Sequence, residues 1–453
     1  MAPASVIVPN RNGSQVLDRC LRQLHSQDHD EFEIIVVDDA STDESVRVAE
    51  RHLDGERLTI VRSDRHRGLG AARNLGLRHA RGRHIAYIDS DGFAAPDWLR
   101  QGVTQLERDP SLGAVASLVF FDGNRTVVNG AGGTMNRFGY GEDIAFNEPF
   151  EFARLAREIV YPMGCGLIAR REALDKVGGF DPLLTNYYDD AELGLKLWRA
   201  GYRVELAQHA WIDHGYGHSN YEHPRKMLLC EQHRIRTVLK HYPLRSLPAW
   251  LCREAASVAG FPTNERERRR KAWAWNLRRL PSTALGRGRL RRAAGLPPPF
   301  SSDSRMYSFP KAIARPTPEE ARPRLRLDGV GDLGALMYGF YEPQTKDGIR
   351  FRWMTDRGAL LMRAQRVTSR VTIECMVVLR GTEVAVEIRP LDDPRCLWRG
   401  GLVAIEPPLA WTRVELPARI RPGTYVLVMS ASQTAHDPSG AVLGLGVAGV
   451  ELS

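Results

Sequence analysis

The sequence predicts an α/β domain with a mostly parallel sheet, then a basic helical segment, then an all-β sandwich. Short apolar runs alternate with helix-like stretches over residues 1 to about 110. Arginine is dense between Glu265 and Arg292, and short strand-like runs separated by turn residues fill 325–453. From these observations we place three regions, at 1–220, 221–300 and 301–453.

Composition limits the class of protein. The chain has 453 residues, enough for two or three domains, and is 43% hydrophobic and 26% charged, as is typical of soluble globular proteins. It has no run of 18 apolar residues, and its N-terminus lacks the pattern of a signal peptide, so we expect a cytoplasmic protein. Six scattered cysteines without CxxC spacing predict neither a zinc site nor a disulfide framework.

In the first region, apolar runs of strand length alternate with apolar residues at helical spacing. The expected strands are 5–9, 32–39, 58–63 and 84–91, and the expected helices are 14–27, 41–53 and 68–80. Ser41, followed by Glu44 three residues later, predicts a capping box at a helix start. Alternation of this kind predicts a parallel sheet that is covered on both faces.

The next stretch is mixed. Residues 112–121 read as a strand, the glycine-rich 129–142 as a loop or hairpin, and 163–182 as strand, short helix and turn. A helix is expected over 189–201, because its first turn is acidic and Gly201 caps its end.

Polar residues stand at the ends of three expected strands. The carboxyl ends of parallel strands meet at one edge of a sheet, where ligands bind, so these side chains are expected to converge on one crevice. They are Asn10, Asn12, Asp38, Asp39, Asp89 and Asp91.

Asp89 and Asp91 carry the clearest chemistry. They follow an apolar run directly, one residue apart, and their charges repel unless a cation, a hydroxyl or water lies between them. Carboxylates with phosphate oxygens are a common ligand set for Mg²⁺, and the pair therefore suits a divalent cation bound to a diphosphate. The alternative is an ordinary surface turn.

Other candidate residues are ambiguous one by one. Asp38 and Asp39 can accept hydrogen bonds from a base or ribose, or can serve a turn, and Arg73 can neutralise phosphate or be a surface charge. Asp189 and Asp190 begin a helix, where an ionised carboxylate is favoured and can remove a proton from a hydroxyl; simple complementation of the helix dipole is the alternative.

His214 and His218 follow a strand-like stretch and are candidate metal ligands. On a loop their spacing is not diagnostic, and a single histidine ligand is the simpler hypothesis.

Taken in order, the motifs are strand–PxxN, DDxSxD, GxxxARNxG, DxD, GGFD…DD and a late histidine. This order resembles the inverting glycosyltransferases of family 2, which have the GT-A fold, and the resemblance covers residues 1 to about 220. It implies a nucleotide pocket, a metal that bridges the diphosphate, and a base that deprotonates the acceptor. The residues implied are Pro9, Asn12, Asp38, Asp39, Arg73 and Asp89 for the nucleotide, Asp91, Asp89 and His214 for Mg²⁺ or Mn²⁺, and Asp190 or Asp189 as base.

The resemblance has two departures. The family's Glu-Asp pair is Asp189-Asp190 here, which leaves open which acid is the base, and His218 adds a second candidate ligand. The implied donor is a UDP- or dTDP-sugar, and the GGFD block, shared with rhamnosyltransferase-like members, favours a deoxysugar. The acceptor is a glycan, a lipid-linked acceptor or a small molecule.

The remaining regions suggest partners. In the β-rich tail, Tyr338, Phe340, Tyr341 and Trp353 can stack on sugar rings or belong to a core, and the tail can also form a homodimer. In the basic segment the tryptophans with nearby arginines are candidates for peripheral contact with the inner face of a membrane, or else they pack the helices against the first domain. These tryptophans are Trp250, Trp273 and Trp275.

Three other functions compete. A sugar-1-phosphate nucleotidyltransferase should carry a glycine-rich phosphate loop after its first strand, where this chain has PNRNG. A catalytically degenerate sugar- or nucleotide-binding protein does not need the full acidic set. A nucleic-acid binder has only the net charge of +9 and the arginine run in its favour, and we expect no nucleic-acid partner.

Overall fold

The computed structural model describes most of the chain and divides it into two compact units. One unit comprises Met1–Phe146 and Ala153–Asp303, and the other comprises Asn147–Phe152 and Ser304–Ser453. The described residues are 3–53, 57–146, 150, 153, 155–215, 224–260, 263–289, 323–326, 336–347, 349–377, 379–380, 382–390, 398–405, 410–433, 435–436, 442–443 and 445–453.

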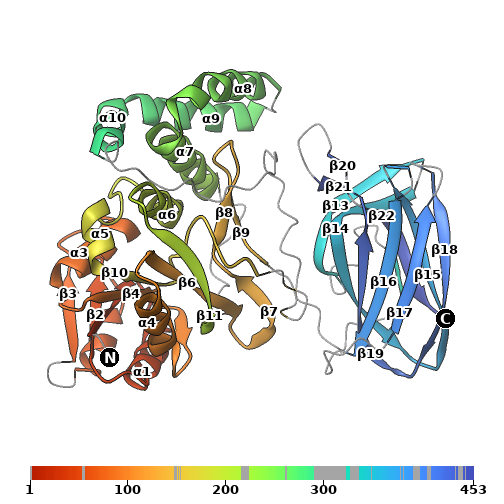
Figure 1. Ribbon diagram of the computed structural model, residues 1–453, viewed down its shortest axis with the longest axis horizontal. Helices are drawn as coiled ribbons and strands as arrows, with labels where there is room; N and C mark the ends of the chain where they lie inside the picture. Colours follow the sequence, from red (N-terminus) through yellow and green to blue (C-terminus); the bar gives the residue numbers. More distant parts are fainter. Residues whose placement is uncertain are drawn as a thin grey trace. The chain divides into compact units, whose positions relative to one another are not determined.

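A mixed sheet forms the centre of the first unit, and its strands are ordered β3-β2-β1-β4-β10-β6-β11-β5, with β7 beside β6 (Figure 1). The strands β3, β2, β1 and β4 run parallel, β10 is antiparallel to β4 and β6, and β6 and β11 are parallel again. The predicted α/β class is confirmed. The strands are β1 Ala4–Asn10, β2 Phe32–Asp38, β3 Leu58–Arg62, β4 His84–Ile88, β5 Gly92–Ala94, β6 Leu112–Phe121, β7 Asn124–Gly130, β10 Gly166–Arg170 and β11 Arg203–His214.

Helices cover both faces of this sheet, because its strands are apolar on both sides. Along β1, for example, Val6 and Val8 belong to one hydrophobic cluster and Ile7 to the other. The first cluster packs α1, α2 and α4, and the second packs α3, α5 and α6. These helices are α1 Leu17–His25, α2 Ser45–Glu50, α3 Leu69–His79, α4 Trp98–Arg108, α5 Arg171–Val177 and α6 Asp189–Arg199.

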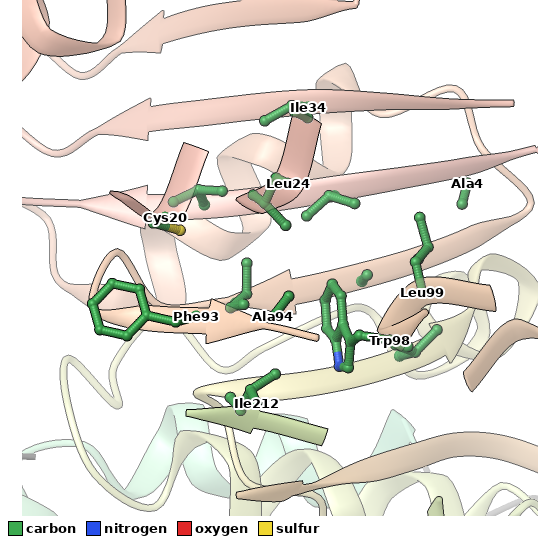
Figure 2. Packing of buried hydrophobic residues seen from close by; sticks show 14 of the residues in the cluster. Ala4, Cys20, Leu24, Ile34, Phe93, Ala94, Trp98, Leu99 and Ile212 are labelled. Carbon is green, nitrogen blue, oxygen red and sulfur yellow. The ribbon is translucent and has the colours of Figure 1, made fainter. Parts of the chain in front are cut away.

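Trp98 anchors α4 in the first cluster. Figure 2 shows its indole among side chains from α1, α4 and the sheet, and it is fully buried. Its Nε1–H donates a hydrogen bond to Ser117 Oγ at 2.7 Å, which satisfies the ring's single polar group.

The capping box predicted at Ser41 and Glu44 is wrong. The helix begins at Ser45, and the Ser41 hydroxyl instead accepts a hydrogen bond from the backbone N–H of Asn12 at 2.9 Å. Asp43 accepts from the backbone N–H of Ser45 at 3.0 Å, so this acid serves the turn before the helix.

Residues 129–142 contain the end of β7 and a short hairpin, as one of the two alternatives predicted. The hairpin strands are β8 Gly133–Met135 and β9 Gly141–Asp143.

Helices continue after the sheet, as predicted for the basic segment. They are α7 Pro224–His241, the 3₁₀ turn η2 Leu244–Ser246, α8 Leu247–Gly260, α9 Thr263–Leu277 and α10 Leu280–Arg289. Trp250 is 4% exposed and donates to the carbonyl of Phe138 at 3.2 Å, while its ring lies 5.8 Å from that of Trp273. Trp275 is half-buried against His233. The prediction of membrane contact is therefore wrong for Trp250, and the packing alternative describes it.

The second unit is all-β, as predicted. Its main sheet is ordered β17-β16-β19-β14-β22-β15-β18, with β12 beside β22 and β13 beside β14, and its core is a separate hydrophobic cluster. The strands are β12 Arg324–Arg326, β13 Leu336–Lys346, β14 Ile349–Ala364, β15 Thr368–Val377, β16 Thr382–Pro390, β17 Trp398–Ile405, β18 Thr412–Ile420, β19 Gly423–Ala431, β20 Ala435–His436, β21 Val442–Leu443 and β22 Leu445–Leu452.

Trp353 belongs to the interior of this unit. It is 7% exposed, and its ring packs edge-on against Phe351 at 5.3 Å, so of the two alternatives the core position describes it and sugar stacking does not. The side chains of Tyr338, Phe340 and Tyr341 lie outside what the structure describes.

Among the described residues, the helices are all too short or too polar to cross a bilayer. Cys20, Cys165, Cys230, Cys252 and Cys375 are free thiols, as expected; Cys396 lies outside the described residues.

Candidate active site

A cavity of about 520 Å³ opens at the carboxyl ends of the parallel strands. Pro9 and Asn10 end β1 in its wall, Ala72 contributes from α3, and 185–187 close it from the loop before α6. Four basic side chains and one acid, Asp39, also line it. The basic residues are Arg11, His66, Arg225 and Lys226.

Asp39 is fixed by three hydrogen bonds at one end of this cavity. Its carboxylate accepts from the backbone N–H groups of Arg67 at 2.8 Å and Gly68 at 2.9 Å, and lies 2.7 Å from His66 Nδ1. Gly68 has φ +92°, and a side chain there would meet the backbone of Thr185 at 2.8 Å. Glycine is therefore required where α3 and the 185–187 loop approach each other.

Two neighbouring acceptor atoms are buried without a partner in the described residues. They are Oδ1 of Asn10 and Oδ1 of Asp38. Such atoms cost free energy unless a donor reaches them, and a ligand with N–H or hydroxyl groups would supply one.

Asp89, Asp91 and His214 meet at the adjoining edge of the sheet. One ligand atom from each lies within 4.8 Å of the others. His214 Nε2 is 3.5 Å from Asp91 Oδ1, and His214 Nδ1 is 2.9 Å from Oδ1 of Asn129, so the imidazole is held on both sides. Burial alone would lower the pKa of His214, but Asp91 and Asp89 raise it overall.

Arg73 joins this group to the start of α6. Its guanidinium is 1% exposed and donates to Asp189 at 2.5 Å, to Asp89 at 2.9 Å and to the carbonyl of Gly164 at 2.7 Å. A side chain at Gly164 would collide with the guanidinium at 2.6 Å. One buried cation thus orders the carboxylates of Asp89 and Asp189.

Asp189 and Asp190 differ in surroundings. Asp189 is buried in its ion pair with Arg73, whereas Asp190 is partly exposed and accepts from the backbone N–H groups of Gly164 at 3.0 Å and Ala191 at 2.8 Å. Burial, reinforced by the charge of Asp189, raises the pKa of Asp190 to about 7. A general base works best when its pKa lies near the working pH, and this pKa meets that condition at neutral pH.

The backbone before these acids is strained. Tyr187 and Tyr188 both have φ +63°, a conformation that is rare for residues other than glycine. His233 Nδ1 lies 2.9 Å from the carbonyl of Tyr187, and Tyr188 Oη accepts from the N–H of Gly141 at 3.3 Å. Strain of this kind persists only where surrounding contacts impose it, and it clusters at functional sites.

Comparison with known proteins finds a family match for the first part of the chain. Residues 5–178 match the model of "Glycosyl transferase family 2". Residues 5–178 form a family 2 glycosyltransferase domain.

Relatives of the family 2 domain include chondroitin synthase of Escherichia coli, 31% identical over 111 residues, which are 24% of this chain and 16% of that protein. The poly(ribitol-phosphate) beta-N-acetylglucosaminyltransferase TarS of Staphylococcus aureus is 31% identical over 114 residues, 24% of this chain and 20% of TarS. An uncharacterized glycosyltransferase of Nostoc sp. is 29% identical over 189 residues, 41% of this chain and 56% of that protein. The chain thus spans less than two thirds of the length of these curated relatives.

Solved structures are similar at lower identity. The mannosyltransferase PcManGT of Pyrobaculum calidifontis, in complex with GDP-Man and Mn²⁺, gives a TM-score of 0.40 at 22% identity, over 64% of this chain and 85% of that one. Residues 1–349 of TarS in complex with UDP-GlcNAc give 0.43 at 18% identity, over 63% of this chain and 88% of that one.

The residues predicted to bind the nucleotide do not all lie at the cavity. Pro9 and Asp39 line the cavity, and Asp38 is buried beside it. Asn12 has φ 56° and its side chain accepts from the N–H of Thr42 at 2.8 Å, which ties two loops together. Arg73 is not among the described residues that line the cavity.

His214 is the candidate histidine ligand that the structure describes. His218 lies outside the described residues, so the structure does not compare the two.

Sequence reasoning missed several residues of this region. Asn129 was hidden in a glycine-rich stretch, although it stands at a strand end like the other polar residues. Asp143 ends β9 and accepts a hydrogen bond from the Tyr161 hydroxyl at 3.2 Å. Burial raises the pKa of Asp143 to about 6. His66 and Lys226 carry no local signal beyond being basic, because only the fold brings them to the cavity.

The donor set of Asp89, Asp91 and His214 fits a divalent cation. Two carboxylates and one imidazole are ligands that Mg²⁺ and Mn²⁺ both accept, and their atoms already converge. Asp89 and Asp91 also repel each other, which a cation between them would relieve.

Proposed function

We propose that the protein is an inverting glycosyltransferase that transfers a sugar from a UDP- or dTDP-sugar to an acceptor hydroxyl in a single displacement. The observation that carries the proposal is that one buried arginine, Arg73, links the Asp89–Asp91–His214 group to Asp189, the neighbour of Asp190, beside a basic cavity. A base, a cation site and a nucleotide-sized cavity are the parts that this reaction needs.

The cavity would hold the nucleoside diphosphate. Asp39 and the partnerless acceptors of Asn10 and Asp38 would receive the N–H and hydroxyl groups of the nucleoside. The basic side chains Arg225 and Lys226 would face the negative phosphates.

A divalent cation held by Asp89, Asp91 and His214 would neutralise charge on the departing diphosphate. Arg73 would hold the carboxylates in place for that task, and we propose it as a positioning residue, since its guanidinium is already engaged with them.

Asp190 would remove the proton from the acceptor hydroxyl. The oxygen would form a bond to the anomeric carbon from the face opposite the phosphate, the bond from that carbon to the phosphate oxygen would break, and configuration would invert. Asp189 is the weaker candidate for base, because its carboxylate is buried against Arg73.

The test is release of nucleoside diphosphate from UDP-, dTDP- and GDP-sugars with Mn²⁺ or Mg²⁺. We expect release from at least one donor with metal, loss of about 10²–10⁴-fold in Asp190→Asn, and loss of metal-dependent release in Asp91→Asn. Asp175→Asn, at an acid whose side chain is 59% exposed on α5, is the matched control and should behave as wild type.

Other outcomes identify the competing functions. Thermal stabilisation by a nucleotide without any release would favour a degenerate binding protein. Pyrophosphate formed from a nucleoside triphosphate and a sugar phosphate would favour a nucleotidyltransferase.

A further inference from the structure

The basic segment separates into an inner and an outer set of cations. The inner arginines are buried and paired with buried acids, so they carry no net charge to the surface. The pairs are Arg234 with Glu231 at 2.9 Å and Glu254 at 2.8 Å, Arg236 with Asp181 at 2.9 Å, and Arg269 with Glu254 at 3.2 Å.

The outer set faces solvent. Among the described side chains from 244 to 287, Glu267 is the one exposed acid, and it pairs with Lys271 at 2.7 Å. The exposed cations are Arg245, Arg253, Arg266, Arg270, Lys271 and Arg278. These helices therefore present a positive surface.

Large apolar side chains are exposed on the same helices. Of the nine exposed large hydrophobic residues in the described chain, five lie here, which is a concentration that scattered surface leucines do not explain. They are Leu244 at 58%, Leu251 at 42%, Leu277 at 62%, Leu280 at 48% and Leu285 at 71%.

The corner between α9 and α10 joins both features. In α9, Arg269, Ala272 and Asn276 form the buried face, and helical spacing places Arg270, Leu277 and Arg278 away from it. Leu280 and Leu285 continue the apolar surface into α10. Figure 1 shows α8, α9 and α10 on the side of α7 away from the sheet.

We propose that this α9–α10 corner, residues 270–285, docks on the surface of a bilayer that contains anionic phospholipids. Leucines can enter the boundary of the acyl chains while the arginines meet headgroup phosphates, and this combination is typical of interfacial helices. A nucleic acid would be bound by the cations alone and would leave the leucines in water. Trp250 takes no part, because it is buried.

The experiment is co-sedimentation of the full chain with vesicles of phosphatidylcholine alone or with phosphatidylglycerol, in physiological salt. Wild type should bind the anionic vesicles and not the neutral ones. Leu277→Ser/Leu280→Ser/Leu285→Ser should bind at least about tenfold more weakly. Arg270→Ser/Arg278→Ser should lose about fivefold for each arginine.

Matched control variants replace an exposed leucine and an exposed arginine that lie outside the α9–α10 corner. Leu53→Ser, at a side chain 52% exposed after α2, and Arg47→Ser, 71% exposed on α2, should bind as wild type. All variants change exposed side chains, and unchanged thermal unfolding checks that they are folded.

Two results would overturn the proposal. One is wild type that stays in the supernatant with anionic vesicles. The other is a triple leucine variant that binds them as tightly as wild type, because the contact would then be electrostatic only. Stronger binding to single-stranded RNA than to vesicles, lost only in the arginine variant, would identify a nucleic-acid surface instead.

Discussion

Asp190 is the residue whose protonation state should govern the rate. Asp189 and Asp143 repel its negative charge and Arg73 attracts it, while burial has the largest effect and raises its pKa to about 7. A base must be ionised to accept a proton, so the active form is present above that pKa and is lost as the pH falls through it.

We therefore predict that kcat/KM is level above pH about 8 and falls about tenfold per pH unit below pH about 6. Asp143→Asn removes one like charge and should move the midpoint to lower pH. Steady-state kinetics of both proteins between pH 5 and 9 measure this. A profile that stays flat through pH 7 would show that Asp190 is not the base.

Asn129 is the second residue to test, because it contacts His214 and is not itself one of the proposed metal ligands. Its Oδ1 can only accept, so it favours a proton on His214 Nδ1 and leaves Nε2, on the side of Asp91, as the ring nitrogen that a cation would bind. Partners of this kind orient metal-binding histidines, and their loss typically weakens metal binding by 10–100-fold.

We predict that Asn129→Ala weakens Mn²⁺ binding about tenfold or more, and that Asn129→Asp, which keeps an acceptor oxygen, restores most of the affinity. Titration calorimetry with Mn²⁺ measures both. Equal affinity in wild type and Asn129→Ala would show that Asn129 has no role in metal binding. Equal loss of affinity in both variants would show that Asn129 acts by packing and not through its acceptor oxygen.

At the scale of elements, a buried ionic cluster ties the acid-bearing helix α6 to α7. Glu192 on α6 is fully buried, and its carboxylate meets Lys240 at 2.5 Å, His241 at 2.9 Å and Lys196 at 3.1 Å. Asp181 is 2.8 Å from Lys240 and extends the cluster. Asp189 and Asp190 begin the same helix, so the cluster also holds the active-site end of α6 in place.

We predict that Glu192→Gln lowers the free energy of unfolding by about 3–5 kcal/mol, because it removes the buried negative charge that Lys196 and Lys240 share. Burial would raise the pKa of Glu192, but Lys196 and Lys240 hold it well below the usual value of 4.5. Its contribution is thus present above pH 4.5 and lost only as the pH falls below it.

Urea unfolding at pH 7 and at lower pH tests this. Glu44→Gln, at an acid 64% exposed and paired with Arg47, is the control and should cost about 0–1 kcal/mol. A cost below about 1 kcal/mol for Glu192→Gln would mean that the cluster does not stabilise α6.

Elements with strong periodicity were predictable from the sequence, since the same apolar positions that define the pattern form the two cores. Leu17, Cys20, Leu21 and Leu24 give helical spacing and are all buried in α1. The failed capping box has a tertiary cause: the hydroxyl of Ser41 is used by the loop that contains Asn12. Likewise, no local pattern places β10 antiparallel between β4 and β6.

The candidate site was predictable where residues follow strands directly, as Asp89 and Asp91 do after β4. It was not predictable where long-range packing decides. Arg73 was expected to meet phosphate, but its surroundings, Asp189 and Gly164, come from segments about a hundred residues away. Asn129 and Asp143 reach the site only because β7 and the β8–β9 hairpin fold beside it.

At the scale of the whole molecule, the chain has two units with separate cores. The cores of the sheet unit draw on residues up to Ile212, and the core of the β unit draws on Leu325 and residues after it. Units with their own cores generally unfold as separate transitions, and a ligand stabilises only the unit that binds it.

We predict two transitions in scanning calorimetry of the full chain, of which only one shifts when a nucleoside diphosphate and Mn²⁺ are added. A ligand at 100 times its dissociation constant adds about 2.7 kcal/mol, which corresponds to roughly 5 °C for a domain of this size. UDP, dTDP, GDP and CDP, each with and without Mn²⁺, should differ, and the nucleotide with the largest metal-dependent shift identifies the donor class. The same shift with and without Mn²⁺ would argue against a cation at Asp89 and Asp91, and one transition that moves as a whole would show that the two units unfold together.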